Sequence, residues 1–171
     1  MKIVNSVLIF FEKRNYLLYL IIFILSVSLF SFLHLDRTFA DPDSFYHAKQ
    51  ATLLLEQGVS TEFPWLSATT LKYNFTDHHF LYHLVLIPFV SIFPPLLGLK
   101  IATVLLASLT IVVFFWFLKT LNIKGAFWFS LFLLTINPFI FRLNLAKAQA
   151  LVLILFFIAL HCLFHKRYLS L

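Results

Sequence analysis

Two aspartates two positions apart, Asp41 and Asp43, are the first residues whose type and spacing suggest chemistry. His47 follows Asp43 by four positions, so these two side chains would share one face of a helix. Such a face can hold a hard cation or a phosphate-bound metal, and one carboxylate could instead act as a general base on an incoming hydroxyl. The alternative interpretation is structural, with Asp41 or Asp43 capping a helix whose polar face is solvated.

A second set of polar residues lies around the start of an apolar run. It consists of Asp77, His78, His79 and His83. His79 and His83 are four positions apart, a spacing that recurs in metal sites, although no glutamate lies beside the first histidine. Two interpretations stay open. In the first, Asp43, His79 and His83 hold a divalent metal. In the second, the histidines border a membrane and hydrogen-bond to loop carbonyls.

Two basic residues, Arg142 and Lys147, lie in a short connection between the last two apolar runs. Their charges would suit a phosphate or pyrophosphate headgroup. The alternative is a pair of cations that extend from the membrane interface into water. Asn137-Pro138, just before this connection, should kink or end the preceding helix.

The elements that must position these residues are set by an unusually apolar composition. Hydrophobic residues make up 61% of the 171 residues, charged residues make up 12%, and there are 23 phenylalanines. A soluble protein is about 45–50% apolar, so most of this chain requires a bilayer as its solvent. The net charge of +6 comes from basic residues that fall mainly at the ends of apolar runs. This distribution indicates membrane orientation and not nucleic-acid binding.

The apolar runs predict an all-α polytopic membrane protein that forms a single module. Four crossings are expected, at residues 16–33, 98–118, 125–141 and 148–164. Between the first two lies a loop, residues 34–97, with an amphipathic helix at 43–57 that ends at Gly58. A short apolar helix at 79–93 should lie in the outer leaflet or re-enter it, because it has too few residues to cross.

The basic residues favour four crossings over five. With four crossings both termini are cytoplasmic, and Glu12 is the one acid on that side. Seven basic residues then lie on the cytoplasmic side: Lys2, Lys13, Arg14, Lys119, Lys124, Lys166 and Arg167. Five crossings would move the last four of them outside. The sequence therefore predicts an integral protein of a bacterial or archaeal plasma membrane, with residues 34–97 on the extracytoplasmic side.

The stretch Asp-Pro-Asp-Ser-Phe-Tyr-His-Ala-Lys at residues 41–49 resembles a motif of the GT-C superfamily of membrane glycosyltransferases. This superfamily includes oligosaccharyltransferase catalytic subunits, protein O-mannosyltransferases and aminoarabinose transferases. The stretch at 137–142 is similar to the end of the crossing that leads into the second outer loop of these enzymes. The resemblance implies sugar transfer from a polyprenyl-phosphate-linked donor in the cell envelope. Asp43 would be the catalytic, metal-binding acid, and Asp41 the acid before it.

The same resemblance implies roles for further residues and partners. Three histidines, His47, His78 and His79, would shape the substrate pocket, and Arg142 and Lys147 would bind the lipid phosphate. Oligosaccharyltransferases carry a second acidic motif in the second outer loop, whereas residues 142–151 contain no acid. The chain is therefore more similar to the metal-independent members, although a divalent metal stays an option. Family members have more crossings, so we expect a fragment of a longer enzyme or a partner subunit that supplies the missing helices.

Two other classes of function stay open. One is a non-catalytic membrane protein that binds a metal or a lipid phosphate, or that serves as a subunit of a larger membrane complex. The other is a small transporter. The transporter is disfavoured, because the apolar runs between Ile101 and Leu160 contain no buried pair of charges, which ion-coupled carriers usually need.

Overall fold

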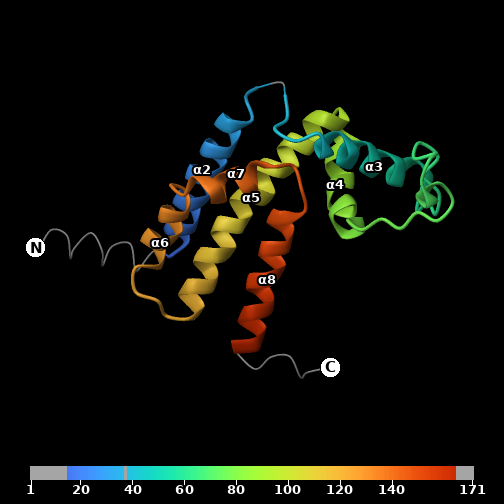
Figure 1. Cartoon of the computed structure of the whole chain (residues 1–171). Helices are drawn as coiled ribbons and strands as arrows, with labels where there is room; N and C mark the ends of the chain where they lie inside the picture. Colours follow the sequence, from blue (N-terminus) through green and yellow to red (C-terminus); the bar gives the residue numbers. More distant parts are fainter. Residues whose placement is uncertain (1–14, 37, 165–171) are drawn as a thin grey trace, which may run out of the picture. The chain divides into compact units, whose positions relative to one another are not determined.

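The computed structural model describes residues 15–36 and 38–164 (Figure 1). In this part of the chain there are seven α-helices, one short 3-10 helix and no strand, which confirms the all-α prediction there. The described residues form two compact units. The long-helix unit comprises residues 15–36, 104–144 and 149–164, and the loop unit comprises residues 38–103 and 145–148.

The long-helix unit is built from strongly apolar helices. They are α2 (Asn15–Leu33), the part of α5 (Pro95–Thr120) from Val104 onward, α6 (Ala126–Leu133), α7 (Asn137–Asn144) and α8 (Gln149–Phe164). Contacts join α2 to α6 and α7 to α8. The ring of Tyr19 on α2 also meets that of Phe115 on α5, with centroids 4.7 Å apart. Polar side chains inside the unit bond to helix backbone, as Thr110 does to the carbonyl of Leu106.

Two helices, α2 and α5, are long and apolar enough to cross a membrane. Both also expose large apolar side chains, for example Leu20 and Ile24 on α2. In water each such side chain would cost about 25 cal/mol per Å² of exposed apolar surface, whereas lipid removes this cost. These two helices therefore indicate a membrane protein.

The crossing predicted at residues 125–141 is not one continuous helix, and it breaks close to the kink expected at Asn137-Pro138. The helix α6 ends at Leu133 and α7 begins at Asn137, and their axes differ by 69°. Pro138 explains the break, because it has no N–H to donate to the preceding turn and its ring opposes helical backbone there. In the first turn of α7 that missing N–H is unimportant. Counted as one span, the bent pair gives three candidate crossings.

The predicted crossing at 148–164 is also not among the helices long enough to cross. In the described residues α8 has 16 residues, and a helix needs about 20 to span the hydrocarbon core. The described helices therefore support two crossings, or three with the bent pair, and fewer than the four predicted.

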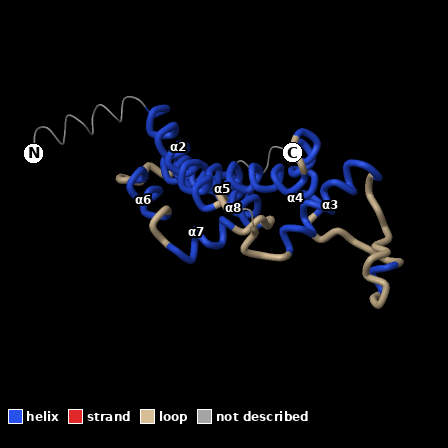
Figure 2. The backbone as a smooth tube through the Cα atoms, turned by 90° about the horizontal axis from the view of Figure 1, so that it is seen from above, coloured by secondary structure: helices blue, strands red, loops and turns tan. Residues whose placement is uncertain are grey.

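The loop unit is centred on a pair of packed helices, α3 (Asp43–Gln57) and α4 (Phe80–Ile92), with the 3-10 helix η1 (Thr70–Lys72) between them in the chain. Figure 2 shows α3 and α4 next to each other from a second direction. The small residues Ser44, Ala48 and Ala51 are buried on α3 and let the helices approach, while Tyr82 and Leu86 are buried on α4. The helices expected at 43–57 and 79–93 are thus confirmed as helices.

The start of α5 is held against the backbone of α4. After α4 ends, Pro95 begins α5, where a proline is readily accepted. One turn later comes Gly98, which is buried against the preceding helix. A Cβ atom at Gly98 would lie 2.6 Å from the carbonyl oxygen of Phe89. This contact therefore requires glycine.

Candidate functional site

Asp41 and Asp43 lie at the N-terminus of α3, where backbone N–H groups lack helical acceptors. The N–H of Asp43 donates to Oδ1 of Asp41 over 2.8 Å, so Asp41 closes the turn that starts the helix. At its other end α3 finishes at Gly58, which has φ +75° and donates its N–H to the carbonyl of Leu54. The positive end of the helix dipole further stabilises both carboxylates, each by about 0.3–1 kcal/mol. The N-cap residue of α3 is Pro42, so Asp41 closes the turn before the helix and is not itself the cap, whereas the predicted stop at Gly58 fits this geometry.

Lys147 joins the two carboxylates. Its Nζ pairs with Oδ2 of Asp41 and lies 2.8 Å from Oδ2 of Asp43. The Asp41 side chain is 15% exposed and that of Asp43 is 59% exposed. The hydrogen bond from Lys147 lowers the pKa of Asp41, and the hydrogen bonds to Asp41 and Asp43 raise the pKa of Lys147. The Asp43 carboxylate is consequently open to solvent and has the ammonium of Lys147 beside it.

Behind this ion pair lies a buried chain of three side chains, Asp77, His83 and His47. The distance from Oδ2 of Asp77 to Nδ1 of His83 is 2.6 Å, and that from Nε2 of His83 to Nδ1 of His47 is 2.8 Å. Because a carboxylate can only accept, His83 carries its proton on Nδ1. Nε2 of His83 is then the acceptor, and His47 carries its proton on Nδ1. The unprotonated nitrogen of His47 is therefore Nε2.

Burial keeps both imidazoles neutral. It lowers the pKa of His47 to about 4, with smaller contributions in the same direction from the neighbouring His83 and His79. Burial also lowers the pKa of His83, although the hydrogen bond to Asp77 opposes that change. At neutral pH both imidazole rings that are hydrogen-bonded in series to Asp77 are therefore uncharged. Such an arrangement can fix a proton's position without placing a cation in the interior.

Aromatic rings enclose the buried chain. The ring of His47 has its centroid 5.2 Å from that of Tyr82 and 5.2 Å from that of His79. The backbone N–H of His79 donates to Oδ1 of Asp77 over 2.9 Å, so both oxygens of this carboxylate are used. The rings and the carboxylate together hold the start of α4 against α3.

The expected metal set of Asp43, His79 and His83 is not assembled in the described residues. In this part of the chain no three His, Cys, Asp or Glu side chains converge as metal ligands would. His83 uses both ring nitrogens in hydrogen bonds within the protein, and Asp43 is paired with Lys147. The residues as arranged do not fit a divalent cation.

The remaining predicted residues are His78 and Arg142. His78 is exposed in the turn before α4. Arg142 is exposed on α7 and belongs to the long-helix unit. The polar residues at 41–47 and 77–83 thus form two groups, the ion pair of Asp41 and Asp43 with Lys147 and the hydrogen-bonded series from Asp77 through His83 to His47.

Sequence reasoning missed two connections. Asp77 had no assigned partner, although its position six residues before His83 at the start of an apolar run was a usable signal. The pairing of Lys147 with Asp41 and Asp43 had no local signal, because these residues are far apart in the sequence. Comparison of the chain with family models, curated proteins and solved structures found no match.

Proposed function

We propose that this chain is a membrane glycosyltransferase module of the GT-C type, acting on a polyprenyl-phosphate-linked sugar at the extracytoplasmic surface. The observation that carries the proposal is the Asp43 carboxylate, 59% exposed at the N-terminus of α3 with the ammonium of Lys147 2.8 Å away. A general base and a cation for a leaving phosphate are the two groups that such a transfer needs.

In the proposed reaction Asp43 takes the proton of the acceptor hydroxyl as that oxygen attacks the anomeric carbon of the donor sugar. The bond between the anomeric carbon and the phosphate oxygen breaks, and the electron pair leaves with the lipid phosphate. An oxocarbenium-like transition state also gains from a nearby carboxylate. The open face of Asp43 gives an acceptor access, whereas Asp41 is more enclosed and supports the turn.

Lys147 is the proposed ligand of the lipid phosphate. Its Nζ has three protons, and the ion pairs with Asp41 and Asp43 use two of them. The remaining N–H can donate to a phosphate oxygen while the carboxylates hold the side chain in place.

The buried chain from Asp77 is proposed to position the site. His47 comes one turn after Asp43 on α3, and its bond to His83 anchors that turn to α4. The exposed His78 and His79 would face the substrate. A cytoplasmic position of both ends, and a partner subunit that adds further helices, belong to this proposal as well.

The experiment uses the full chain in nanodiscs with a fluorescent short-chain polyprenyl phosphate, followed by a panel of radiolabelled polyprenyl-phosphate hexoses. Lys147→Ala should weaken lipid-phosphate binding about tenfold, with Lys124→Ala as the matched control. Asp43→Asn should retain that binding but lower sugar release at least ~100-fold, as expected for loss of a general base, while Glu56→Gln on the same helix retains release.

Three outcomes would each overturn a different part of this proposal. Release that survives in Asp43→Asn would remove Asp43 as the base. Binding by the wild type without release of any sugar would favour the non-catalytic alternative, a protein that holds a lipid phosphate. Failure to bind polyprenyl phosphate would refute a lipid-linked donor.

A further inference from the structure

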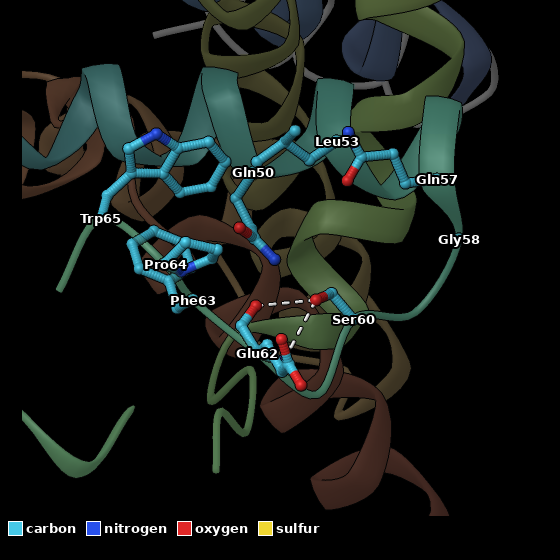
Figure 3. A pocket seen from close by; sticks show the side chains of 9 residues that line it. All are labelled: Gln50, Leu53, Gln57, Gly58, Ser60, Glu62, Phe63, Pro64 and Trp65. Carbon is cyan, nitrogen blue, oxygen red and sulfur yellow. Dashed lines mark hydrogen bonds between the residues drawn. The ribbon is translucent and has the colours of Figure 1, made fainter. Parts of the chain in front are cut away.

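A polar cavity in the loop unit lies along the second half of α3. It has a volume of about 240 Å³ and is bordered by Gln50, Leu53 and Gln57 from α3 and by Gly58, Ser60 and residues 62–65 of the following loop. Figure 3 shows these side chains surrounding the cavity. A neighbouring hollow of about 230 Å³ shares Gln50, Phe63 and Trp65 with it and adds Tyr46 and Lys49.

The amide of Gln50 points into this cavity, between Phe63 and Pro64 on one side and Ser60 on the other (Figure 3). Gln50 is only 6% exposed, yet its Oε1 has no hydrogen-bond partner in the described residues. A buried amide oxygen without a partner costs about 1–3 kcal/mol. Position 50 would be more stable with an apolar side chain, so the amide is better explained by an external ligand.

The loop presents further groups of complementary kinds. The hydroxyl of Ser60 donates to the carbonyl of Glu62 over 2.7 Å and accepts the N–H of Glu62 over 3.2 Å, so this turn is fixed (Figure 3). Trp65 is 61% exposed, and its ring packs edge-on against Phe63 with centroids 5.2 Å apart. A flat aromatic surface therefore lies beside an amide, a carboxylate and a hydroxyl.

We propose that this cavity binds one ring of a neutral saccharide. A sugar ring has an apolar face that can stack on Trp65 and a rim of hydroxyls that both donate and accept. Gln50 and Gln57 offer amide donors and acceptors, and Glu62 offers an acceptor for hydroxyls. The volume is below the roughly 300–1,000 Å³ of drug-sized pockets, which suits a single ring. An extended peptide would need a longer groove.

This inference does not rest on the proposed transfer reaction, because none of Asp41, Asp43 and Lys147 borders the cavity. A loop that only recognises carbohydrate would have the same cavity. If the protein binds saccharide but releases no sugar from the donor, only the transferase proposal is overturned. If it releases sugar but binds no free saccharide, only the cavity proposal is overturned.

The test is saturation-transfer NMR on the full chain in nanodiscs. The probes are methyl α-mannoside, methyl β-glucoside and N-acetylglucosamine. Sorbitol serves as a polyol without a ring, and a serine-alanine hexapeptide represents a peptide ligand. At least one sugar should show saturable transfer, with neither sorbitol nor the peptide doing so. Gln50→Leu and Trp65→Ala should each weaken binding roughly tenfold or more, while Trp128→Ala, an exposed tryptophan of α6, should leave it unchanged.

Gln50→Leu also separates binding from folding. Because it removes an unpaired buried oxygen and keeps a similar volume, its thermal unfolding midpoint should equal or exceed that of the wild type. Loss of sugar binding with undiminished stability supports the proposal. Absence of saturable transfer for every sugar, equal transfer for the peptide, or undiminished sugar binding in Gln50→Leu overturns it.

Discussion

At the scale of single residues, the hydrogen bonds assign a proton to each imidazole. Asp77 fixes the tautomer of His83, and His83 fixes that of His47, as the 2.6 Å and 2.8 Å distances require. The rings of His47 and His83 are favoured in their neutral forms, because a proton added to either ring would place a charge in a buried position. The cost of that charge makes the folded loop unit sensitive to acid.

The first prediction follows from the lowered pKa of His47. The unfolded chain binds a proton near pH 6.5, whereas the folded chain does so near pH 4. The stabilisation by neutral His47 is therefore complete above about pH 6.5 and is lost as the pH falls toward 4. The groups acting on this ring are His83, His79, Asp43 and Lys147.

The effect is measured by thermal unfolding in nanodiscs between pH 7.5 and pH 4. The upper limit lies about one unit above the ordinary pKa of histidine. His47→Gln should flatten the acid-induced decline of the unfolding midpoint. His78→Gln, at an exposed position, should leave the decline unchanged. Parallel curves for the wild type and His47→Gln would show that His47 is not the responsible group.

At the scale of elements, local sequence signals predicted the helices of the loop unit well. The helical spacing after Asp43 and the glycine at position 58 specify α3, which spans Asp43–Gln57. The apolar run after His79 specifies α4. These signals are local, so no knowledge of the tertiary contacts was needed.

Other features depend on contacts that local patterns do not contain. Pro138 was expected to kink or end the helix and does account for a break, but the sequence did not indicate that α6 would end as early as Leu133, with turns at 134–136 before α7. Similarly, from the sequence alone Gln50 looks like any polar residue on the solvent-exposed face of a helix. Its burial and its unpaired oxygen follow from the path of the loop at 58–65.

The contact between α4 and α5 leads to a prediction for Gly98→Ala. In a free helix alanine is favoured over glycine by about 1 kcal/mol. Here the added Cβ would lie 2.6 Å from a backbone oxygen, so the helices must separate, at a cost of roughly 1–3 kcal/mol. We expect a lower unfolding midpoint for Gly98→Ala than for the wild type.

The control for this measurement is Leu96→Ala, at an exposed position in the first turn of α5. It changes the same helix without entering the contact with Phe89, so its midpoint should stay near that of the wild type. An unchanged or raised midpoint in Gly98→Ala would mean that α5 does not approach α4 as closely as described.

At the scale of the whole molecule, the apolar helices α2 and α5 are each long enough to cross a membrane. The loop unit contains five of the seven acids, and Lys119 and Lys124 lie at and just beyond the end of α5. Because basic residues gather on cytoplasmic segments, the proposed orientation has α5 crossing the membrane with the loop unit on the extracytoplasmic side.

Cysteine labelling tests this orientation. In a Cys162→Ser background, Ser67→Cys and Lys124→Cys each introduce one thiol at an exposed position outside the long helices. An impermeant maleimide should label Ser67→Cys on intact cells, and it should label Lys124→Cys only after the membrane is opened. Labelling of both positions on intact cells would contradict a crossing by α5.

The ion pair of Lys147 with Asp41 and Asp43 also has a consequence for biosynthesis. The ribosome adds about 100 residues between Asp43 and Lys147, which takes roughly 5–20 s at usual elongation rates. During that interval the two carboxylates have emerged without the ammonium that later joins them. The proposed site is therefore completed only after residue 147 has been synthesised, and a nascent chain stalled before that residue carries an acidic pair that is still open to other cations.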